Sequence, residues 1–353
     1  MSRILVTGGA GFIGSCYVLE RVLEGDVVLN LDNLTYASNI ENLSAVEGLP
    51  NYYFQKGDIC DPALVAELLT SFNPDSVVNF AAETHVDRSI VNPQPFIQTN
   101  INGTFNLLHQ SNGWWQSNSR KKSGFKFIQI STDEVFGSLK FGEPAFTEST
   151  CLAPSSPYSS SKASSDLIAL AYFKTFGFPV IVTNCSNNYG PRQFPEKLIP
   201  FMLDSALKGK DLPIYGDGSN IRDWLFVKDH CSAVEAIRKY GKTGERYLIG
   251  GNCELSNLEI VKIICSHLDG VKPKTSGHYQ EQIKFVTDRP GHDLRYAINS
   301  NKLKKELGWR PEYSFERGIS ETLNWYLNNQ AWMDNIKKRN EFSNWIKNNY
   351  EKR

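Results

Sequence analysis

Apolar and polar positions follow two different periods over the first half of the chain. Short runs rich in β-branched and aromatic residues, which are typical of buried strands, fall at residues 3–7, 27–31, 52–55, 76–80, 127–130 and 178–183. Between them, apolar residues recur at helical spacing, as at residues 62–70, 99–110 and 158–176. Strands that alternate with helices predict an α/β fold with a doubly wound, Rossmann-like parallel sheet and right-handed crossovers.

The strict alternation weakens after about residue 190, where prolines and glycines interrupt the chain. We therefore predict a Rossmann domain over residues 1–190, which carries the candidate chemistry. A smaller, partly interleaved C-terminal lobe over residues 191–353 would close over the carboxyl edge of the sheet. Within the first domain, residues 114–124 are interpreted as a polar loop with an unexplained aromatic pair, Trp114 and Trp115.

A glycine-rich turn follows the first predicted strand. Gly9, Gly11 and Gly14 fit the spacing G-x-G-x-x-G, and Gly8 adds a second spacing, G-x-x-G-x-x-G. Such glycines let a pyrophosphate approach the backbone, and the helix that follows offers its free N–H groups to the anion. The second predicted strand ends at Asp32, whose carboxylate would accept hydrogen bonds from a ribose 2′-hydroxyl and repel a 2′-phosphate. The order strand, glycines, helix, strand and acid predicts a dinucleotide site that prefers NAD.

Composition excludes several other classes of function. The 353 residues carry 38 basic and 38 acidic side chains, so no net charge directs the chain to nucleic acid or to an anionic membrane. No apolar run approaches the roughly 20 residues of a membrane span, and no leader is visible before the first strand. Seven cysteines without a C-x-x-C pair, and dispersed histidines, argue against disulfides and against a metal site. We expect a soluble cytoplasmic protein that holds no metal.

Polar side chains stand directly after the predicted strand at residues 127–130. Thr132, Asp133 and Glu134, preceded by Ser131, would lie at the carboxyl end of a sheet strand, where open α/β sheets bind ligands. Groups that exchange protons are costly to crowd together unless a reaction uses them. The alternative is that Asp133 or Glu134 merely caps the next helix.

Tyr158 and Lys162 are spaced four residues apart, on one face of a predicted helix that Pro154 and Pro157 would help to start. The ammonium would favour the phenolate and lower the pKa of the tyrosine, which would make it a base near neutral pH. By itself the pattern is nearly as consistent with a pair on the helix surface. Its place after the dinucleotide unit and the Ser131–Thr132 strand end favours catalysis.

Taken together, these motifs resemble the extended short-chain dehydrogenase/reductase family. The resemblance rests on residues 7–14, Asp32, and the pair Tyr158 and Lys162. The nucleotide-sugar 4,6-dehydratase branch of that family is similar in further blocks, at residues 81–89, 131–135, 184–191, 194–200, 221–224 and 288–293. Several of these blocks lie in the second lobe, so the resemblance covers nearly the whole chain.

The resemblance implies an NAD-dependent hydro-lyase that acts on dTDP-glucose in deoxysugar (rhamnose-type) biosynthesis. Tyr158, supported by Lys162, would take the proton of the sugar 4-hydroxyl while hydride leaves C4, and Thr132 would hydrogen-bond the C4 oxygen. Glu134 would then remove the C5 proton. Asp133, kept protonated by its crowded neighbour, would protonate the departing C6 hydroxyl. Hydride returned to C6 would complete a 4-keto-6-deoxy sugar.

The same resemblance implies the binding residues. Those for NAD are Gly8, Gly11, Phe12, Ile13, Gly14, Asp32, Asn33, Leu34, Thr35, Asp58, Ile59, Ala81, Ala82, Thr99, Tyr158, Lys162 and Asn188. Those for the nucleotide sugar are Thr84, Thr132, Asn187, Glu196, Lys197, Leu198, Pro213, Tyr215, Arg222, Asn257, Arg289 and His292. Arg222 and Arg289 suit a diphosphate, although structural salt bridges are the alternative for both. For Tyr215 the alternative is core packing, and for His292 it is an ordinary surface position.

Two further expectations concern the assembly and the competing functions. The resemblance implies a homodimer in which the helices at residues 99–110 and 158–176 form a four-helix bundle with a second copy. A nucleotide-sugar 4-epimerase or decarboxylase of the same family would need Thr132, Tyr158 and Lys162 but not the pair Asp133 and Glu134. A non-catalytic NAD sensor would need only the glycines and Asp32. The intact set of five favours the dehydratase.

Overall fold

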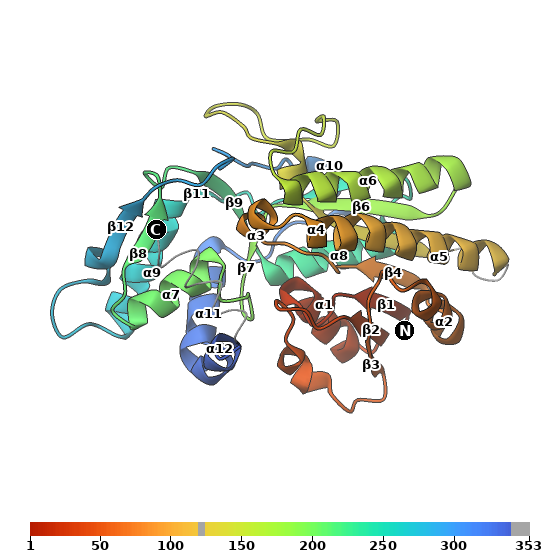
Figure 1. The fold of residues 1–353 in the computed structure, drawn as a ribbon, viewed down its shortest axis with the longest axis horizontal. Coiled ribbons are helices and arrows are strands. Elements are labelled where there is room, and N and C mark those ends of the chain that lie inside the picture. Colours follow the sequence, from red (N-terminus) through yellow and green to blue (C-terminus); the bar gives the residue numbers. More distant parts are fainter. Residues whose placement is uncertain (119–123, 340–353) are drawn as a thin grey trace.

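A seven-stranded parallel sheet forms the centre of the computed structural model, which describes residues 1–118 and 124–339 (Figure 1). Its strand order is β10-β6-β5-β4-β1-β2-β3. The strands span β1 Arg3–Thr7, β2 Val27–Asp32, β3 Tyr52–Lys56, β4 Ser76–Asn79, β5 Lys126–Thr132, β6 Val180–Cys185 and β10 Arg246–Ile249. Almost every residue of the inner strands is buried, because helices cover both faces as a parallel sheet requires. The predicted doubly wound, Rossmann-like fold is confirmed.

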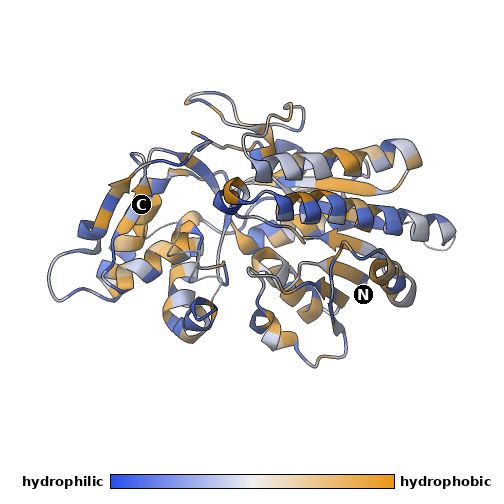
Figure 2. Cartoon of the chain, viewed as in Figure 1, coloured by the Kyte–Doolittle hydropathy of each residue, from blue (hydrophilic) through white to orange (hydrophobic). Residues whose placement is uncertain are grey.

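Two layers of helices cover this sheet. One hydrophobic core joins one face of the strands to α1 (Phe12–Leu23), α8 (Val227–Tyr240) and α10 (Asn301–Leu307). A second core joins the other face to α2 (Pro62–Phe72), α5 (Thr104–Ser117) and α6 (Pro157–Phe176). Hydrophobic residues mark the strands and parts of the helices in Figure 2. Because neighbouring residues of a strand point to opposite faces, Ile4 belongs to the first core and Leu5 to the second.

The remaining elements build the smaller lobe and the connections. The small sheets contain β7 (Asn187–Tyr189), β9 (Ile221–Phe226) and β11 (Glu254–Ser256), and β8 (Leu212–Tyr215) with β12 (Ile283–Val286). They pack with α7 (Leu198–Leu207), α9 (Asn257–Val271), α11 (Phe315–Asn328) and α12 (Gln330–Lys337) in a core of their own. Short connecting elements are η1 Ile40–Val46, α3 Val86–Val91, α4 Gln94–Phe96, η2 Ile97–Gly103, η3 Asp133–Phe136 and η4 Tyr279–Gln282.

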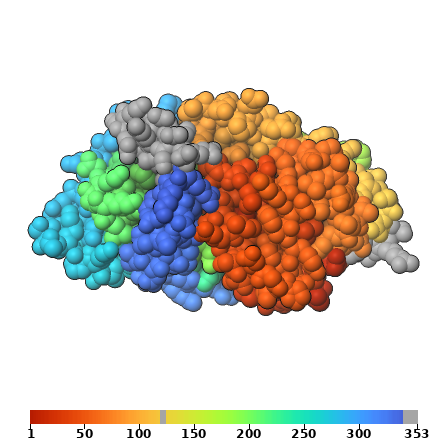
Figure 3. All heavy atoms as spheres, turned by 60° about the horizontal axis from the view of Figure 1, so that its bottom comes forward, coloured from red at the N-terminus to blue at the C-terminus, as the bar shows by residue number. Residues whose placement is uncertain are grey.

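The chain passes between the two lobes more than once. Strand β10 and helix α8 come after residue 190 and nevertheless belong to the large sheet and its covering layer. Conversely, α12 reaches back to the N-terminal region, where the Trp332 indole donates to Asn42 at 2.9 Å. The blue C-terminal helices lie beside the red and orange N-terminal region in Figure 3. The division into residues 1–190 and 191–353 stays a prediction about lobes, and residues 340–353 lie outside the described part.

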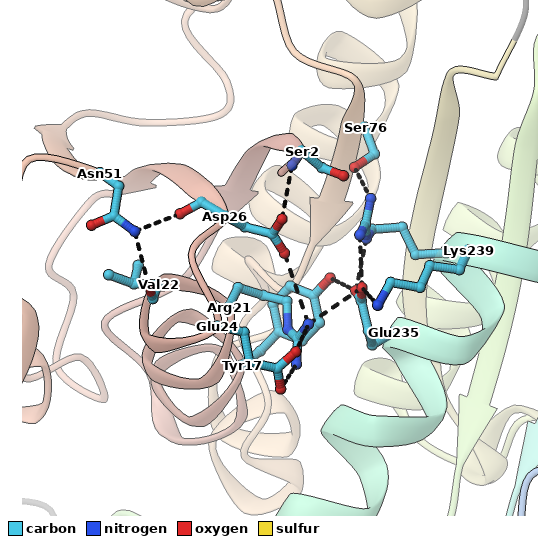
Figure 4. A network of polar contacts seen from close by, with 11 residues as sticks. Ser2, Tyr17, Arg21, Val22, Glu24, Asp26, Asn51, Ser76, Glu235 and Lys239 are labelled. Atoms are coloured by element: carbon cyan, nitrogen blue, oxygen red, sulfur yellow. Dashed lines mark hydrogen bonds and ion pairs between the residues drawn. The ribbon is translucent and has the colours of Figure 1, made fainter.

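A buried polar network joins the two helices on one face of the large sheet (Figure 4). Glu235 of α8 accepts from Arg238, at 2.7 Å to each of its oxygens, and from the Tyr17 hydroxyl of α1 at 2.9 Å. Arg21 of α1 lies 3.3 Å from the same carboxylate. These cations hold the pKa of Glu235 at about 2 although burial acts to raise it. The network fixes α1, whose first turn follows the glycines, against α8.

The prediction of a polar loop at residues 114–124 is wrong in its first part. Trp114 and Trp115 lie in α5, which continues to Ser117. Their rings pack against Phe125 and Phe178 in the second core, so the aromatic pair anchors the end of this helix. The rest of the expected loop, residues 119–123, lies outside the described residues.

Candidate active site

The catalytic candidates after β5 form a single tight turn. Thr132 ends the strand, and its hydroxyl accepts a hydrogen bond from the Glu134 backbone N–H at 3.3 Å. Asp133 and Glu134 therefore open the short helix η3 without capping it, because Thr132 is the cap. The hydroxyl of Thr132 also donates to Asp133 Oδ1 at 3.3 Å, while Asp133 Oδ2 is buried and has no hydrogen-bond partner among the described residues. A buried orphan oxygen of this kind is consistent with a protonated carboxyl.

The two carboxyl groups experience different electrostatic surroundings. Burial, and next the charge of Glu134, raise the pKa of Asp133 well above its usual range. Burial also raises the pKa of Glu134, but Arg289, Lys197 and Arg222 oppose that effect. The arrangement protonates Asp133 in preference to Glu134, which is how two neighbouring carboxyls can divide acid and base roles.

Helix α6 presents Tyr158 and Lys162 to the same region. Pro157 occupies the first helical position, and a capping box between Ser156 and Ser159 satisfies the free N–H groups there. The Lys162 ammonium donates to the Ile130 carbonyl of β5 at 2.7 Å. Both residues are almost fully buried, so the alternative of a pair on the helix surface is excluded.

The expectation that Lys162 lowers the pKa of the Tyr158 phenol is wrong for the protein alone. Burial, and then the charges of Glu134 and Cys185, raise the pKa of Tyr158 well above its usual range. Burial lowers the pKa of Lys162. The sequence pattern shows the spacing of the two groups but not their burial, which is the largest cause of both pKa shifts.

The glycine turn has the close approaches that the fingerprint requires. A Cβ atom on Gly14 would stand 2.3 Å from the Gly8 carbonyl oxygen, and Gly8 itself has a positive φ of 71°. Asp32 follows at the end of β2 and accepts from the Ala10 and Leu34 backbone N–H groups, each at 2.8 Å, and from the Ser38 hydroxyl at 2.9 Å. A carboxylate has about four acceptor sites, so one remains for a ribose hydroxyl.

A cavity of about 290 Å³ unites the turn after β5, helix α6 and the glycine turn at the carboxyl edge of the large sheet. All five catalytic candidates line it, as do all the predicted NAD residues except Leu34. Leu34 has a left-handed backbone conformation and contributes its N–H to Asp32. Among the predicted sugar residues, the cavity is lined by Thr84, Thr132, Asn187, Glu196 and Lys197.

The other predicted sugar residues belong to the smaller lobe, outside this cavity: Leu198, Pro213, Tyr215, Arg222, Asn257, Arg289 and His292. Arg289 forms an ion pair with Asp87 of α3 at 2.6 Å, and the Tyr215 hydroxyl donates to the same carboxylate at 3.4 Å. Arg222 donates to the Ile221 and Asp293 carbonyls at 2.7 and 2.9 Å. The structural alternative for Arg289, a salt bridge, is thus present, but its charge and that of Arg222 still act on Glu134.

Two more predicted sugar ligands have partners within the protein. Glu196 accepts from Arg88 at 3.1 Å and is almost completely buried. His292 Nδ1 lies 2.6 Å from Asp288, and its ring meets Tyr215 edge to face with 6.1 Å between centroids. Burial first, and the charge of Arg289 next, lower the pKa of His292 to about 4, so the ring is neutral near pH 7.

Sequence reasoning missed several residues that line the cavity. They include Ser38, Cys185, Ser186, Gln193 and Phe194. Cys185 ends β6, the neighbour of β5, so the rule that strand ends face the ligand could have found it. Ser38 and Gln193 lie in loops, where no periodic signal marks a lining position.

Comparison with known proteins agrees with this geometry. The model of the family described as GDP-mannose 4,6 dehydratase matches residues 5–322. The chain is 54% identical to a dTDP-glucose 4,6-dehydratase of Xanthomonas campestris over 339 residues, which cover 95% of this chain and 96% of the relative.

Two solved structures extend the similarity to three dimensions. A dTDP-glucose 4,6-dehydratase from Bacillus anthracis in complex with NAD has a TM-score of 0.84 and 48% identity, and covers 96% of this chain and 100% of that one. The enzyme of the same description from Streptomyces venezuelae, with NAD and dTDP bound, has a TM-score of 0.86 and 44% identity, with 95% and 100% covered.

Proposed function

The chain belongs to the family described as GDP-mannose 4,6 dehydratase, and we propose that the cavity at the edge of the large sheet is its active site. The relatives reported above are dTDP-glucose 4,6-dehydratases, and the cavity would carry out their reaction. The reaction is that of an NAD-dependent hydro-lyase in deoxysugar biosynthesis. It converts dTDP-glucose into dTDP-4-keto-6-deoxyglucose and water. Oxidation at C4 comes first, then loss of water across C5 and C6, then reduction at C6.

The glycine turn and Asp32 fit NAD. Without a Cβ, Gly14 packs closely on the Gly8 backbone, so the turn and the first turn of α1 can receive a pyrophosphate. Asp32 keeps one acceptor site for the ribose hydroxyl, and its charge disfavours a 2′-phosphate. NAD held there would supply the hydride chemistry of the reaction, as the oxidant at C4 and, once reduced, the reductant at C6. The other predicted cofactor residues line the same space, with Leu34 acting through its N–H on Asp32.

In the first step Tyr158 accepts the proton of the sugar 4-hydroxyl, and Thr132 holds the C4 oxygen. The phenol has to be ionised for this, which burial and the nearby carboxylates oppose. Lys162, one turn later on α6, is the nearby cation that would favour the phenolate, although burial prevails over it in the protein alone. Hydrogen bonding to Thr132 acts in the same direction, because it lowers the pKa of the phenol.

In the second step the carboxyl pair removes water. The new 4-keto group acidifies C5–H, and Glu134 takes that proton as the carboxylate that three cations help to keep ionised. Asp133, whose pKa is raised by burial and by Glu134, donates its proton to the C6 hydroxyl, which leaves as water. Glu134 returns its proton to C5 when hydride reaches C6.

The smaller lobe holds the nucleotide sugar in this proposal. Lys197, Arg222 and Arg289 place three cations near the carboxyl pair, and guanidinium groups suit diphosphate oxygens. The Asp87 carboxylate now paired with Arg289 would share that cation with the substrate. Thr84, Asn187, Glu196, Leu198, Pro213, Tyr215, Asn257 and His292 complete the proposed sugar and base contacts.

One observation carries the dehydratase function over its rivals. An epimerase or decarboxylase needs Thr132, Tyr158 and Lys162 but has no use for two adjacent carboxyls of which one holds its proton more strongly than the other. Asp133 and Glu134 supply such a pair at the mouth of the NAD cavity. A non-catalytic sensor would need neither of them.

The direct test offers the purified protein dTDP-glucose and, separately, UDP-glucose. We expect the dTDP sugar to lose one water and gain a C6 methyl group, as seen by mass spectrometry and NMR. An unchanged mass with inversion at C4 would instead establish an epimerase. Comparing the two nucleotides also decides the preference for thymidine over uridine, which the residues do not reveal.

We also propose a homodimer and a cytoplasmic location. The paired helices α5 and α6 carry the half-exposed apolar side chains Phe105, Leu167 and Phe176, which a four-helix bundle with a second copy would cover. All seven cysteines are free thiols, which supports a reducing compartment. None of the described helices is long and apolar enough to cross a membrane, and no cluster of potential metal ligands occurs among the described residues.

A further inference from the structure

Three polar side chains form a buried cluster behind the catalytic residues, and the steps above do not use them. Asp166 of α6 and Asn184 of β6 are completely buried, and the side chain of Arg246 of β10 is 10% exposed. Asp166 Oδ2 accepts from Asn184 Nδ2 and from Arg246 Nη1, each at 3.0 Å. Arg246 Nη1 also donates to Asn184 Oδ1 at 2.6 Å, so the three side chains close a ring of hydrogen bonds.

The members of this cluster lie beside the two segments that carry the catalytic candidates. Asn184 donates to the Thr132 carbonyl at 3.0 Å and so holds the end of β5. The Arg246 guanidinium lies 5.5 Å from the ring centre of Phe136, in the short helix that carries Asp133 and Glu134. Asp166 lies one turn beyond Lys162 on α6. The cluster thus links the β5 turn to the helix of Tyr158 and Lys162.

We propose that Asp166, Asn184 and Arg246 are positioning residues of the dehydratase site, which fix these two segments relative to each other, and that Asp166 keeps Lys162 charged. The inference rests on the proposed function and assigns roles to residues that touch neither substrate nor cofactor. Its physical basis is that a buried ammonium is stable only with a nearby negative charge and a full set of acceptors.

The groups that face Lys162 support this role for Asp166. On β5 its ammonium has the Ile130 carbonyl, and on β6 it faces the Cys185 thiol. Asp166, on its own helix, is the carboxylate that opposes the effect of burial on the Lys162 pKa. Burial raises the pKa of Asp166 itself, and Arg246, followed by Asn184, opposes that rise. Arg246 therefore acts on Lys162 through Asp166.

The decisive variant is Asp166→Asn, which keeps the shape and removes the charge. Without the carboxylate the Lys162 pKa falls, so the ammonium is lost at lower pH. We expect the alkaline limb of kcat to move down by about one pH unit, since a nearby opposite charge shifts a pKa by roughly one to three units. At neutral pH we expect kcat to fall about tenfold while KM for dTDP-glucose stays within about twofold.

Two further variants distinguish a positioning role in catalysis from a contribution to folding stability alone. Asp166→Asn leaves Arg246 as an unpaired buried charge, whereas the double variant Asp166→Asn/Arg246→Gln removes both charges. The double variant should regain much of the lost Tm but keep the shifted alkaline limb. Glu235→Gln, in the network of Figure 4, is the matched control: it breaks another buried carboxylate–arginine pair and should lower Tm without moving the pH profile.

A pH profile of Asp166→Asn parallel to that of the parent protein, with only Tm reduced, would overturn the proposal. So would an equal shift in Glu235→Gln. If Asp166→Asn fails to fold, the double variant carries the same comparison. Dehydration of dTDP-glucose by the parent is established first, so a failure of the proposed function shows in the parent and a failure of this inference only in the variants.

Discussion

At the scale of single residues, two adjacent carboxyl groups after β5 differ in how firmly they hold a proton. Asp133 and Glu134 are adjacent, yet burial and two carboxylates raise the pKa of Asp133, while three cations from the smaller lobe oppose the rise at Glu134. Those cations are Lys197, Arg222 and Arg289. The division into acid and base therefore comes from the tertiary structure, not from the dipeptide.

Glu134→Gln tests that division. We expect oxidation at C4 to continue, because Thr132, Tyr158 and Lys162 remain, and dehydration to stop for want of a base at C5. The dehydrated product should form about 10²–10⁴ times more slowly, the usual contribution of a general base. Rapid-mixing absorbance of the cofactor follows oxidation, and mass spectrometry follows the loss of water.

Glu67→Gln is the control for this substitution, because Glu67 is an exposed carboxylate on α2 and should leave both steps unchanged. Product formation by Glu134→Gln at the parent rate would show that another group removes the C5 proton. Loss of oxidation together with dehydration would give Glu134 a role in the first step as well.

The sequence predicted the identity of these catalytic groups but not their energetics. Lys162 was expected to lower the pKa of the Tyr158 phenol, whereas its ammonium donates to Ile130 and burial raises that pKa. Arg289 shows the same limit: its side chain was recognised, but its pairing with Asp87 depends on a contact between residues 202 positions apart. Desolvation and long-range pairing have no signature in local spacing.

At the scale of elements, the glycine turn is where sequence and structure agree best. A tight turn between strand and helix has few solutions, so glycines at fixed spacing identify it directly. The end of α5 shows the opposite case. Trp114 and Trp115 look out of place in a polar stretch, and they extend the helix because Phe125 and Phe178 receive their rings. Tertiary packing of this kind overrides local composition.

Gly14→Ala tests how closely the turn must pack. The added Cβ would meet the Gly8 carbonyl oxygen at 2.3 Å and the Gly9 Cα at 2.9 Å, so α1 would have to move away from β1. We expect a loss of about 1–3 kcal/mol in the free energy of unfolding, the usual cost of overpacking, together with weaker NAD binding. Denaturant unfolding and cofactor titration measure the two effects.

Gly270→Ala provides the matched control in α9. Outside the nearby backbone of α9, no atom of the described residues lies within 4 Å of its added Cβ, and its φ is not positive. The change should therefore be neutral or stabilise the protein by up to about 1 kcal/mol. Unchanged NAD affinity in Gly14→Ala would mean that the backbone of the turn does not contact the pyrophosphate.

At the scale of the whole molecule, the sequence predicted the sheet better than the path of the chain. Strand β10 and helix α8 belong to the large sheet although they come after the point where regular alternation fades. The intervening elements β7, α7, β8 and β9 interrupt the pattern before the chain returns. A periodicity read along the chain cannot show such a return, because it reflects neighbours in sequence and not neighbours in space.

The proposed dimer is tested by Leu167→Lys. Leu167 is 58% exposed on α6, beside α5 with Phe105, and a bundle with a second copy would bury it. Burying a leucine contributes about 1.5–3 kcal/mol, and a two-fold symmetric interface contains the residue twice. We therefore expect the dimer Kd to rise more than about 100-fold and the protein to elute as a folded monomer in size-exclusion chromatography with light scattering.

Leu23→Lys is the control for this substitution. Leu23 ends α1 and is 68% exposed, so its replacement should leave the mass of the dimer unchanged. A dimer that survives Leu167→Lys intact, or dissociates equally in Leu23→Lys, would place the interface elsewhere than on α5 and α6.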